Sequence, residues 1–406
     1  MEGGTWLESE RIGLMGGSFN PIHHVHVEMA RIAMKEAGLH KVLFLPTGNP
    51  PHKRDGLAAA GNRFKMVQLA LAAQEDFFPS DIEMNRNGIV YTVDTLSLLH
   101  QQLPSAKFYY IIGEDTLYNL LQWRNPERVF QMCRFLVCPR PYAKDGVDAE
   151  SVLKELKRQG AVFSFLPVQA QELSSSGIRD ALSSGGEPVG LNPAVMEYIR
   201  VMGIYGIKES PEGFAPYMEQ LSNSMSLQRF AHTLCVSYTA RKLAALHGAD
   251  EQKAALAGLL HDCAKGMGLL SMQEYACRNG LVVEKSIFAS GALLHASVGA
   301  HMAQREYGVT DVQVQSAIAR HTLGDAPMTK LDMIVYLADK IEPCREHYHG
   351  LDEIRQLAQK DLAAAMALSL EQTQAYVKGR GKELHPASAR TLQWLHETKK
   401  ANNDWN

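Results

Sequence analysis

The sequence lacks several features that would assign it to a specialised class of protein. Neither sign of charge dominates, because 41 basic residues stand against 44 acidic ones and the formal net charge is −3. This balance argues against a general nucleic-acid-binding protein. No apolar run approaches the ~20 residues that a membrane-spanning helix needs, so we expect no membrane partner. The opening MEGGTWLESE has no basic segment before an apolar core, so we expect no signal peptide and a cytoplasmic location.

Cysteine is also scarce, with six in 406 residues and no CxxC pair. We therefore expect buried structural thiols in a reducing compartment, and no disulfide framework. The remaining composition is that of an ordinary globular protein, with 46% hydrophobic and 21% charged residues. The length suffices for two or three domains.

The two halves of the chain differ in hydrophobic patterning. From about residue 11 to 206, helical segments alternate with strand-like runs, namely RIGLMGG, KVLFLP, KFYYIIG, CRFLVCPR and AVFSFLP, and we expect a strand pair around DIEMNRNGIVY. This alternation predicts an α/β Rossmann-like fold, a doubly wound parallel sheet. From about residue 211 only helical periodicity remains, which predicts an all-α bundle. The predicted domains are 1–206 and 207–406.

Glycine-rich and polar segments of the first half stand where phosphate binding is expected. GGSFNPIHHVH follows the first strand and opens a helix, and such a helix N-terminus binds anions. His23 and His26 would share a face once helical. PTGNPPHK adds His52 and Lys53, and LSSSGIR adds serines and Arg179. Each motif alone also fits an ordinary loop or helix cap.

Taken in order, and with DIEMNRNGIVYTVDTL, YIIGEDTL and LLQW, these segments resemble the nicotinate-nucleotide adenylyltransferase family of the HxGH nucleotidylyltransferase superfamily. The resemblance implies transfer of AMP from ATP, with Mg²⁺, to nicotinate mononucleotide, giving deamido-NAD and pyrophosphate. A phosphate nucleophile is already ionised at neutral pH and needs no general base.

The same resemblance implies roles for individual residues. His23, His26 and Arg179 would act on the ATP phosphates, with Ser175 and Arg179 at the distal end. His52 and Lys53 would lie near the mononucleotide phosphate, and Asp115 near the adenosine ribose. Tyr91, Thr92 and Trp123 would line the nicotinate pocket. The full set implied to bind substrate is Gly16, Gly17, Ser18, Phe19, His52, Lys53, Tyr91, Thr92, Gly113, Asp115, Trp123, Arg140, Ser174 and Ser175.

One position departs from the HxGH pattern, because Val25 stands where the family has glycine or another small residue. A β-branched side chain there would crowd the adenine or the ribose. We therefore expect a transferase that is weakened, shifted in substrate geometry, or rescued by a local backbone change.

The second half contains a dispersed set of histidines and aspartates of the kind that bind metal ions. An adjacent pair, His261 and Asp262, follows an apolar helical run and is costly to bury unless it is coordinated. Nitrogen and oxygen ligands together suit Fe, Mn, Co or Zn. Six ligands exceed the need of one tetrahedral zinc ion, which favours two ions. The predicted ligands are His232, His261, Asp262, His295, His321 and Asp339. Cys263 would point away on the helix.

The segments RFAH, GLLHDCAK, LLHASVGAHMA, AIARHT and MIVYLADKIEP resemble the HD-domain metal-dependent phosphohydrolases. The match is closer to the bacterial family that splits diadenosine tetraphosphate symmetrically into two ADP. The resemblance implies a dinuclear centre and favours iron. Asp262 and Lys265 are the implied catalytic residues, and Arg229 would also neutralise phosphate charge.

The sequence thus predicts a bifunctional enzyme of nucleotide metabolism that uses ATP, nicotinate mononucleotide and diadenosine tetraphosphate. One alternative is a nucleotide sensor in which the first domain regulates the hydrolase without turnover. Another keeps both enzymes but changes their substrates, with phosphopantetheine for the first and a nucleoside monophosphate or guanosine alarmone for the second. A homo-oligomer is left open.

Overall fold

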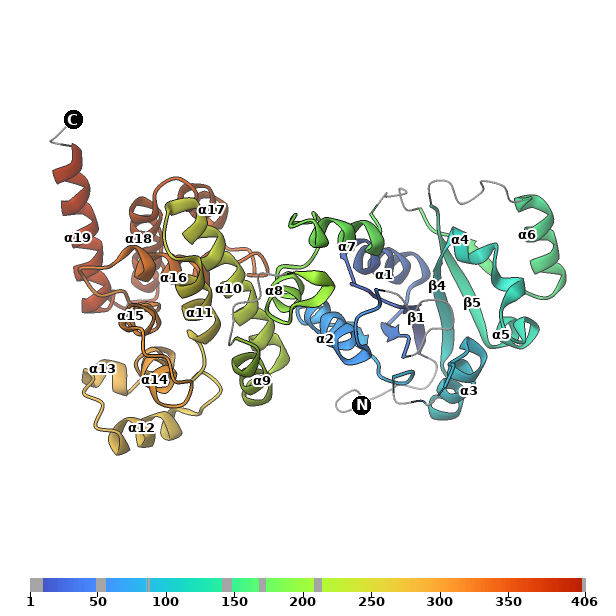
Figure 1. The fold of residues 1–406 in the computed structure, drawn as a ribbon, viewed down its shortest axis with the longest axis horizontal. Coiled ribbons are helices and arrows are strands. Elements are labelled where there is room, and N and C mark those ends of the chain that lie inside the picture. Colours follow the sequence, from blue (N-terminus) through green and yellow to red (C-terminus); the bar gives the residue numbers. More distant parts are fainter. Residues whose placement is uncertain are drawn as a thin grey trace. The chain divides into compact units, whose positions relative to one another are not determined.

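The computed structural model describes residues 10–48, 56–84, 86, 88–140, 148–167, 173–207 and 214–403. The chain divides into two compact units (Figure 1). Among the described residues, those up to Val195 and from Gly203 to Ile207 form the first unit. Met196–Met202 and all residues from Phe214 onward form the second. Residues 196–202, which were expected in the first domain, therefore pack with the second unit.

The first unit is built on a six-stranded parallel sheet, in the order β3-β2-β1-β4-β5-β6. Its strands are β1 (Arg11–Gly17), β2 (Lys41–Pro46), β3 (Phe77–Pro79), β4 (Lys107–Gly113), β5 (Cys133–Cys138) and β6 (Phe163–Phe165). The strand order reverses between β1 and β4, and parallel α/β sheets bind ligands at the carboxyl ends of strands at such a point. The predicted Rossmann-like class is confirmed.

Among the described residues, six helices connect these strands: α1 (His24–Ala37), α2 (Ala60–Leu71), α3 (Thr92–Gln102), α4 (Glu114–Leu117), α5 (Pro126–Met132) and α6 (Ala149–Arg158). After β6 come α7 (Ser175–Ser183) and α8 (Pro193–Val201), and the residues of α8 from Met196 onward belong to the second unit. Short 3₁₀ turns are η1 (Leu120–Gln122) and η2 (Ile204–Gly206). Apolar residues of α3, α5 and α6 form one core with β1, β2, β4 and β5, including Leu96, Phe130 and Leu156. Burial of this apolar surface fixes the strands whose carboxyl ends form the site.

The strand pair expected around DIEMNRNGIVY is wrong. The described residues between Asp81 and Val90 form turns and irregular backbone, and the strand β3 lies upstream of them. Gly88 has a φ of +86°, which turns the chain there. Glu83 accepts a hydrogen bond from Thr95 Oγ1 at 2.9 Å, so this segment is held against α3.

The second unit contains only helices among its described residues (Figure 1), which confirms the predicted all-α class. They are α9 (Phe214–Ser224), α10 (Leu227–His247), α11 (Glu251–Leu260), α12 (Leu269–Arg278), α13 (Lys285–Phe288), α14 (Gly291–Arg305), α15 (Val312–Arg320), α16 (Lys330–Ile341), α17 (Leu351–Ala358), α18 (Leu362–Gly379) and α19 (Pro386–Asn403). Throughout the described part of the chain, no helix has the length and apolarity needed to cross a bilayer.

Helices α10 and α11 approach closely because Gly258 has no side chain. A Cβ there would lie 2.9 Å from Ser237 Cα. The cysteines only partly follow expectation, because four are buried but Cys277 and Cys344 are exposed. Cys277 lies near the end of α12 and Cys344 follows α16.

Candidate active sites

Packing within the protein, without any ligand, constrains the conformation of the loop after β1. A Cβ at Gly16 would overlap the hydroxyl of Tyr110, so glycine is required there even without a ligand. Phe19 is buried, and its ring meets the ring of His26 edge-on, with centroids 5.2 Å apart. Phe19 therefore supports the loop from within the core.

His23 and His26 lie together, but the expected arrangement on one helical face is wrong. His23 is the N-cap of α1, with an extended backbone at φ −144°, and His26 is in the first turn. Their ring centroids are 3.8 Å apart, and His23 N donates to His26 Nδ1 at 3.2 Å. Burial lowers the pKa of His23 to about 4 and that of His26 well below its usual value. Both imidazoles are therefore neutral at pH 7 and can bind phosphate as hydrogen-bond donors.

A cavity of about 400 Å³ opens at the carboxyl ends of β1 and β4. Nine of the residues predicted to bind nucleotide line it: Gly16, Gly17, His26, Tyr91, Thr92, Gly113, Asp115, Trp123 and Arg140. Sequence reasoning missed other lining residues, among them Thr47, Glu83, Tyr110 and Arg124. Tyr110 opens the motif YIIGEDTL and Arg124 follows LLQW, but only the folded chain reveals that they line the cavity.

Charged and aromatic groups both line this cavity. Arg140 Nε lies 3.5 Å from Asp115 Oδ1. The Trp123 ring packs edge-on against Tyr110 with centroids 5.8 Å apart, and the Arg124 guanidinium lies 4.6 Å above the Tyr91 ring. The cavity thus offers aromatic surface and cationic groups to a ligand that contains flat rings and phosphate.

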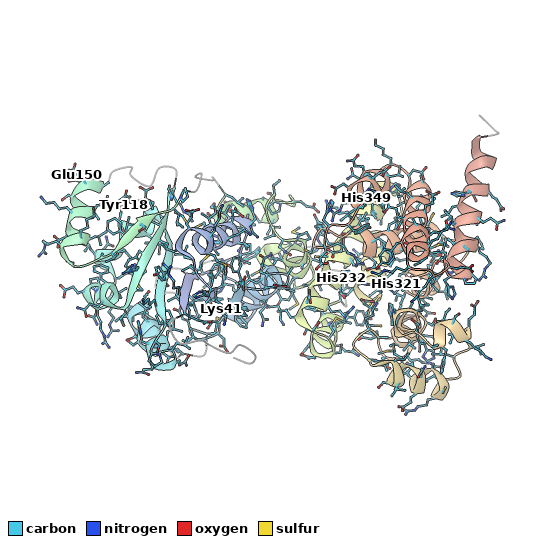
Figure 2. All side chains as sticks on the ribbon, turned by 180° about the vertical axis from the view of Figure 1, so that it is seen from behind. Lys41, Tyr118, Glu150, His232, His321 and His349 are labelled. Carbon is cyan, nitrogen blue, oxygen red and sulfur yellow. The ribbon has the colours of Figure 1, made fainter. Side chains whose placement is uncertain are left out.

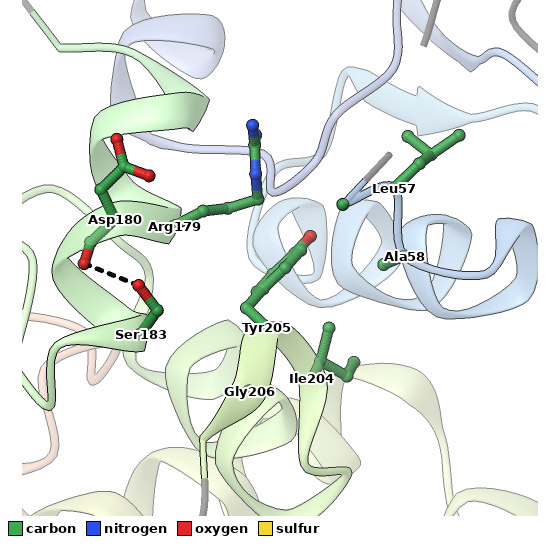
Figure 3. A pocket seen from close by; sticks show the side chains of 9 residues that line it. Leu57, Ala58, Arg179, Asp180, Ser183, Ile204, Tyr205 and Gly206 are labelled. Carbon is green, nitrogen blue, oxygen red and sulfur yellow. Dashed lines mark hydrogen bonds between the residues drawn. The ribbon is translucent and has the colours of Figure 1, made fainter. Parts of the chain in front are cut away.

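Other predicted residues do not line this cavity. Ser174 caps α7 by accepting from Gly177 N at 3.1 Å, and Ser175 Oγ donates to Pro21 O at 2.9 Å. Arg179 lines a second cavity of about 450 Å³ (Figure 3). Ser18 and His23 are likewise not part of the first cavity's lining. His52 and Lys53 lie outside the described residues.

Val25 is buried in α1, at 8% exposure, and is not among the described residues that line the first cavity. The structure therefore offers no support for the expected crowding of the nucleotide, and that hypothesis stays a prediction.

The second unit brings all six predicted metal ligands into one cluster, from five helices or their ends. Two of them, His232 and His321, are labelled in Figure 2. His232 Nε2 lies 3.1 Å from Asp339 Oδ1, which is 3.8 Å from His261 Nε2. His295 Nε2 lies 3.2 Å from Asp262 Oδ1 and 3.1 Å from His321 Nε2. Asp262 belongs to both groups of ligand atoms, so its carboxylate can bridge two ions.

In each of the four clustered histidines, Nε2 faces the other ligand atoms and Nδ1 already has a hydrogen-bond partner. Nδ1 pairs with Gly258 O in His261, with Gly291 O in His295 and with Ile318 O in His321, at 2.7, 3.2 and 2.7 Å. His232 Nδ1 pairs with Glu342 Oε1 at 3.2 Å. A metal-binding histidine usually has such a partner, which orients its free nitrogen. Sequence reasoning missed Glu342, although it follows Asp339 by less than one helical turn.

The cluster fits a metal centre better than a set of internal hydrogen bonds. His261 Nε2 is buried and has no hydrogen-bond partner among the described residues. Burial lowers the pKa of His261, and it lowers that of His321 to about 3, so these rings are neutral and their nitrogens can bind a cation. Burial would raise the pKa of Asp262, but the surrounding histidines and Lys265 hold it well below its usual value. Cys263 is not a ligand, since its Sγ contacts Gly299 O at 3.4 Å.

Four cationic side chains lie within 4 Å of the carboxylates of the cluster, and one of them, Lys340, has its Nζ 3.8 Å from Asp339 Oδ2. The other three are Arg229, Lys265 and Arg345. Arg229 Nη1 lies 2.7 Å from Asp262 Oδ2, and Lys265 Nζ lies 3.6 Å from Asp262 Oδ1. Arg345, which the sequence did not single out, lies 3.3 Å from Asp339 Oδ1. Arg229, Lys265 and Arg345 are each about one third exposed and can therefore meet an anionic ligand from solvent.

The fold and the two sites define a nucleotidylyltransferase-type α/β unit joined to a helical unit with an HD-type ligand cluster. Residues 14–181 match the cytidylyltransferase-like family model, and residues 229–344 match that of the HD domain.

Two sequence relatives and one solved structure illustrate the two halves. A Mycoplasma genitalium protein named "probable nicotinate-nucleotide adenylyltransferase/Ap4A hydrolase" is 29% identical over 91% of this chain and 99% of its own. A Synechococcus protein named "probable nicotinate-nucleotide adenylyltransferase" is 39% identical over 49% of this chain and 98% of its own. A Clostridium acetobutylicum structure, described as a predicted HD superfamily hydrolase involved in NAD metabolism, is 34% identical, with a TM-score of 0.44, and covers 46% of this chain and 97% of its own.

The chain therefore belongs, over its first half, to the nicotinate-nucleotide adenylyltransferase family, and its second half carries an HD domain.

Proposed function

We propose that the protein is a bifunctional enzyme. Its first unit transfers AMP from ATP to nicotinate mononucleotide, and its second unit hydrolyses diadenosine tetraphosphate to two ADP. The observation that carries the first activity is the cavity at the β1 and β4 ends, whose lining contains nine residues predicted to bind nucleotide. A relative named for both activities matches almost the whole chain, which supports the combination.

In the transferase, the phosphate of nicotinate mononucleotide attacks the α-phosphorus of ATP and pyrophosphate leaves. Because the nucleophile is already ionised, the protein acts by holding the reactants in line and stabilising charge. Neutral His23 and His26 donate hydrogen bonds to phosphate oxygens, and Arg179 holds the distal phosphates. Mg²⁺ enters with ATP. The aromatic groups Tyr91 and Trp123 hold the nicotinate ring.

In the hydrolase, His232, His261, Asp262 and Asp339 would hold one metal ion, and Asp262, His295 and His321 a second. Two metal ions held there would supply an activated water and stabilise charge on the scissile phosphate. Iron is the favoured metal. Arg229, Lys265 and Arg345 can exchange their contacts with the carboxylates for contacts with substrate phosphates. Three cations suit a polyphosphate chain better than a nucleoside monophosphate.

The test is to incubate purified protein with ATP, Mg²⁺ and nicotinate mononucleotide, and separately with diadenosine tetraphosphate, and to quantify products by chromatography. We expect deamido-NAD with equimolar pyrophosphate in the first reaction and two ADP per substrate in the second. Binding of ATP without pyrophosphate release would identify a sensor. Release only with phosphopantetheine, or faster hydrolysis of a nucleoside monophosphate or guanosine alarmone, would reassign the substrate.

The proposed partners are these small nucleotides, with neither nucleic acid nor membrane among them.

A further inference from the structure

Asn20, in the loop between β1 and α1, is contacted by three other segments of the first unit. Its Oδ1 accepts from Ala58 N at 3.0 Å and from Tyr205 Oη at 2.7 Å. Its Nδ2 donates to Gly56 O at 2.9 Å, and its main-chain oxygen accepts from Arg179 Nη1 at 2.8 Å. Asn20 is only 4% exposed. Protein groups therefore fix the position of this loop.

Helix α7 docks on the same loop at two points. Ser175 Oγ donates to Pro21 O, and Arg179, one turn further on, donates to Asn20 O. Among the described residues, only the Nη1 of Arg179 has a hydrogen-bond partner. The rest of the guanidinium is available to an anion, while its position depends on Asn20.

Tyr205 contacts Asn20 from a segment far away in the sequence. Its backbone has φ 63° and ψ 28°, in the left-handed region that non-glycine residues rarely adopt. The side chain lines the cavity that Arg179 also lines (Figure 3). Residues in such a conformation persist where their surroundings over-determine them. The fold thus holds the Tyr205 hydroxyl against a local backbone preference.

We propose that Tyr205 is a positioning residue for adenylyl transfer, which fixes the guanidinium of Arg179 relative to the ATP phosphates through Asn20. This inference rests on the proposed function, in which Arg179 holds the distal phosphates. Without the hydroxyl, Asn20 Oδ1 keeps one donor instead of two, and the oxygen that receives Arg179 becomes less constrained. The effect falls on the KM for ATP, because Tyr91 and Trp123, which are proposed to hold the nicotinate ring, line the other cavity.

The test removes only the hydroxyl, in Tyr205→Phe. The KM for ATP should rise about fivefold, the effect expected from one neutral hydrogen bond, while the KM for nicotinate mononucleotide stays unchanged. Tyr109→Phe is the matched control, since Tyr109 is also buried in the first unit and its hydroxyl accepts from Arg11 Nε at 3.2 Å. This control should leave both KM values unchanged.

A double-mutant cycle separates positioning from a general loss of structure. In an Arg179→Lys background, Tyr205→Phe should change the KM for ATP by less than about twofold, because coupled residues are not additive. All assays are run below the melting temperature of each variant.

The two proposals fail in different ways. Absence of deamido-NAD with the wild-type protein would contradict the proposed function itself. If the wild type is active, three results would overturn the positioning role of Tyr205. These are an unchanged KM for ATP in Tyr205→Phe, an equal rise in the KM values for both substrates, and full additivity of Tyr205→Phe with Arg179→Lys.

Discussion

Asp262 carries the most contacts in the metal-ligand cluster, so its removal should affect the hydrolase most. Its carboxylate is 3% exposed and belongs to both groups of ligand atoms. Asp262→Ala should remove at least one ion per chain and lower hydrolysis by about 100-fold or more, while deamido-NAD synthesis continues. Elemental analysis and the two product assays measure this. Asp352→Ala, at an aspartate whose side chain is 66% exposed, is the control. If Asp262→Ala kept its full metal content and a normal rate of hydrolysis, Asp262 would not belong to the metal site.

Glu83 should make the stability of the first unit depend on pH. Burial raises the pKa of Glu83 from 4.5 to about 6, although a hydrogen bond from Thr95 opposes the shift. The folded state therefore binds the proton more tightly than the unfolded chain, and stability falls as the pH rises from 4.5 to about 6. Above that window the ionised carboxylate costs about 2 kcal/mol.

The variant Glu83→Gln keeps an acceptor for Thr95 Oγ1 and removes the charge. The melting temperature of the first unit should rise by several degrees at pH 7.5 and change little at pH 4.5. Thermal unfolding at both pH values measures the difference. An equal shift at the two pH values would show that ionisation of Glu83 is not the cause.

At the scale of elements, the contact between α10 and α11 sets the distance between two metal ligands. His232 lies on α10, and His261 directly follows α11. A Cβ at Gly258 would lie 2.9 Å from Ser237 Cα and 3.1 Å from Ser237 N, and backbone atoms cannot rotate away. Gly258→Ala should therefore destabilise the second unit by about 1–3 kcal/mol and reduce metal content and hydrolysis.

Gly268→Ala is the matched control in the same unit, because a Cβ there would meet nothing within 4 Å. Melting temperature and metal content are compared for the two variants. If Gly258→Ala matched the Gly268→Ala control in both measurements, close helix packing would not be what positions the cluster.

Regular elements could be predicted from the sequence where one local signal dominates. KVLFLP forms β2 because a short apolar run suits a buried parallel strand, and α1 ends before Gly38, whose φ is +58°. The strand pair predicted for DIEMNRNGIVY was wrong because its alternation of polar and apolar residues competes with turn formation at Gly88 and with the contact between Glu83 and Thr95. Hydrophobic periodicity alone does not reveal such a tertiary contact.

The cluster around His261 and Asp262 could be anticipated because an adjacent histidine and aspartate are rarely buried without a cation. Contacts between distant segments could not. Arg63 lies in α2, yet it is fully buried and donates to Ala58 O, Ser18 O and Gly48 O. Tyr205 and Arg345 likewise acquire their significance only from the residues that folding brings to them.

At the scale of the whole molecule, each unit has its own core and its own site. The nucleotide cavity is lined by residues from Met15 to Arg140, and the ligand cluster extends from His232 to Asp339. No described residue belongs to both sites, so the two reactions should be separable by single substitutions.

His26→Ala tests this separation. Loss of one donor to the transferring phosphate should reduce deamido-NAD synthesis by about 10²–10³-fold. Hydrolysis of diadenosine tetraphosphate should stay at the wild-type rate, because His26 lies in the first unit and the ligand cluster in the second. Asp262→Ala provides the reciprocal case. Both activities are measured on the same preparation, together with the melting temperature. A folded His26→Ala protein that has lost both activities would show that the two sites depend on one another.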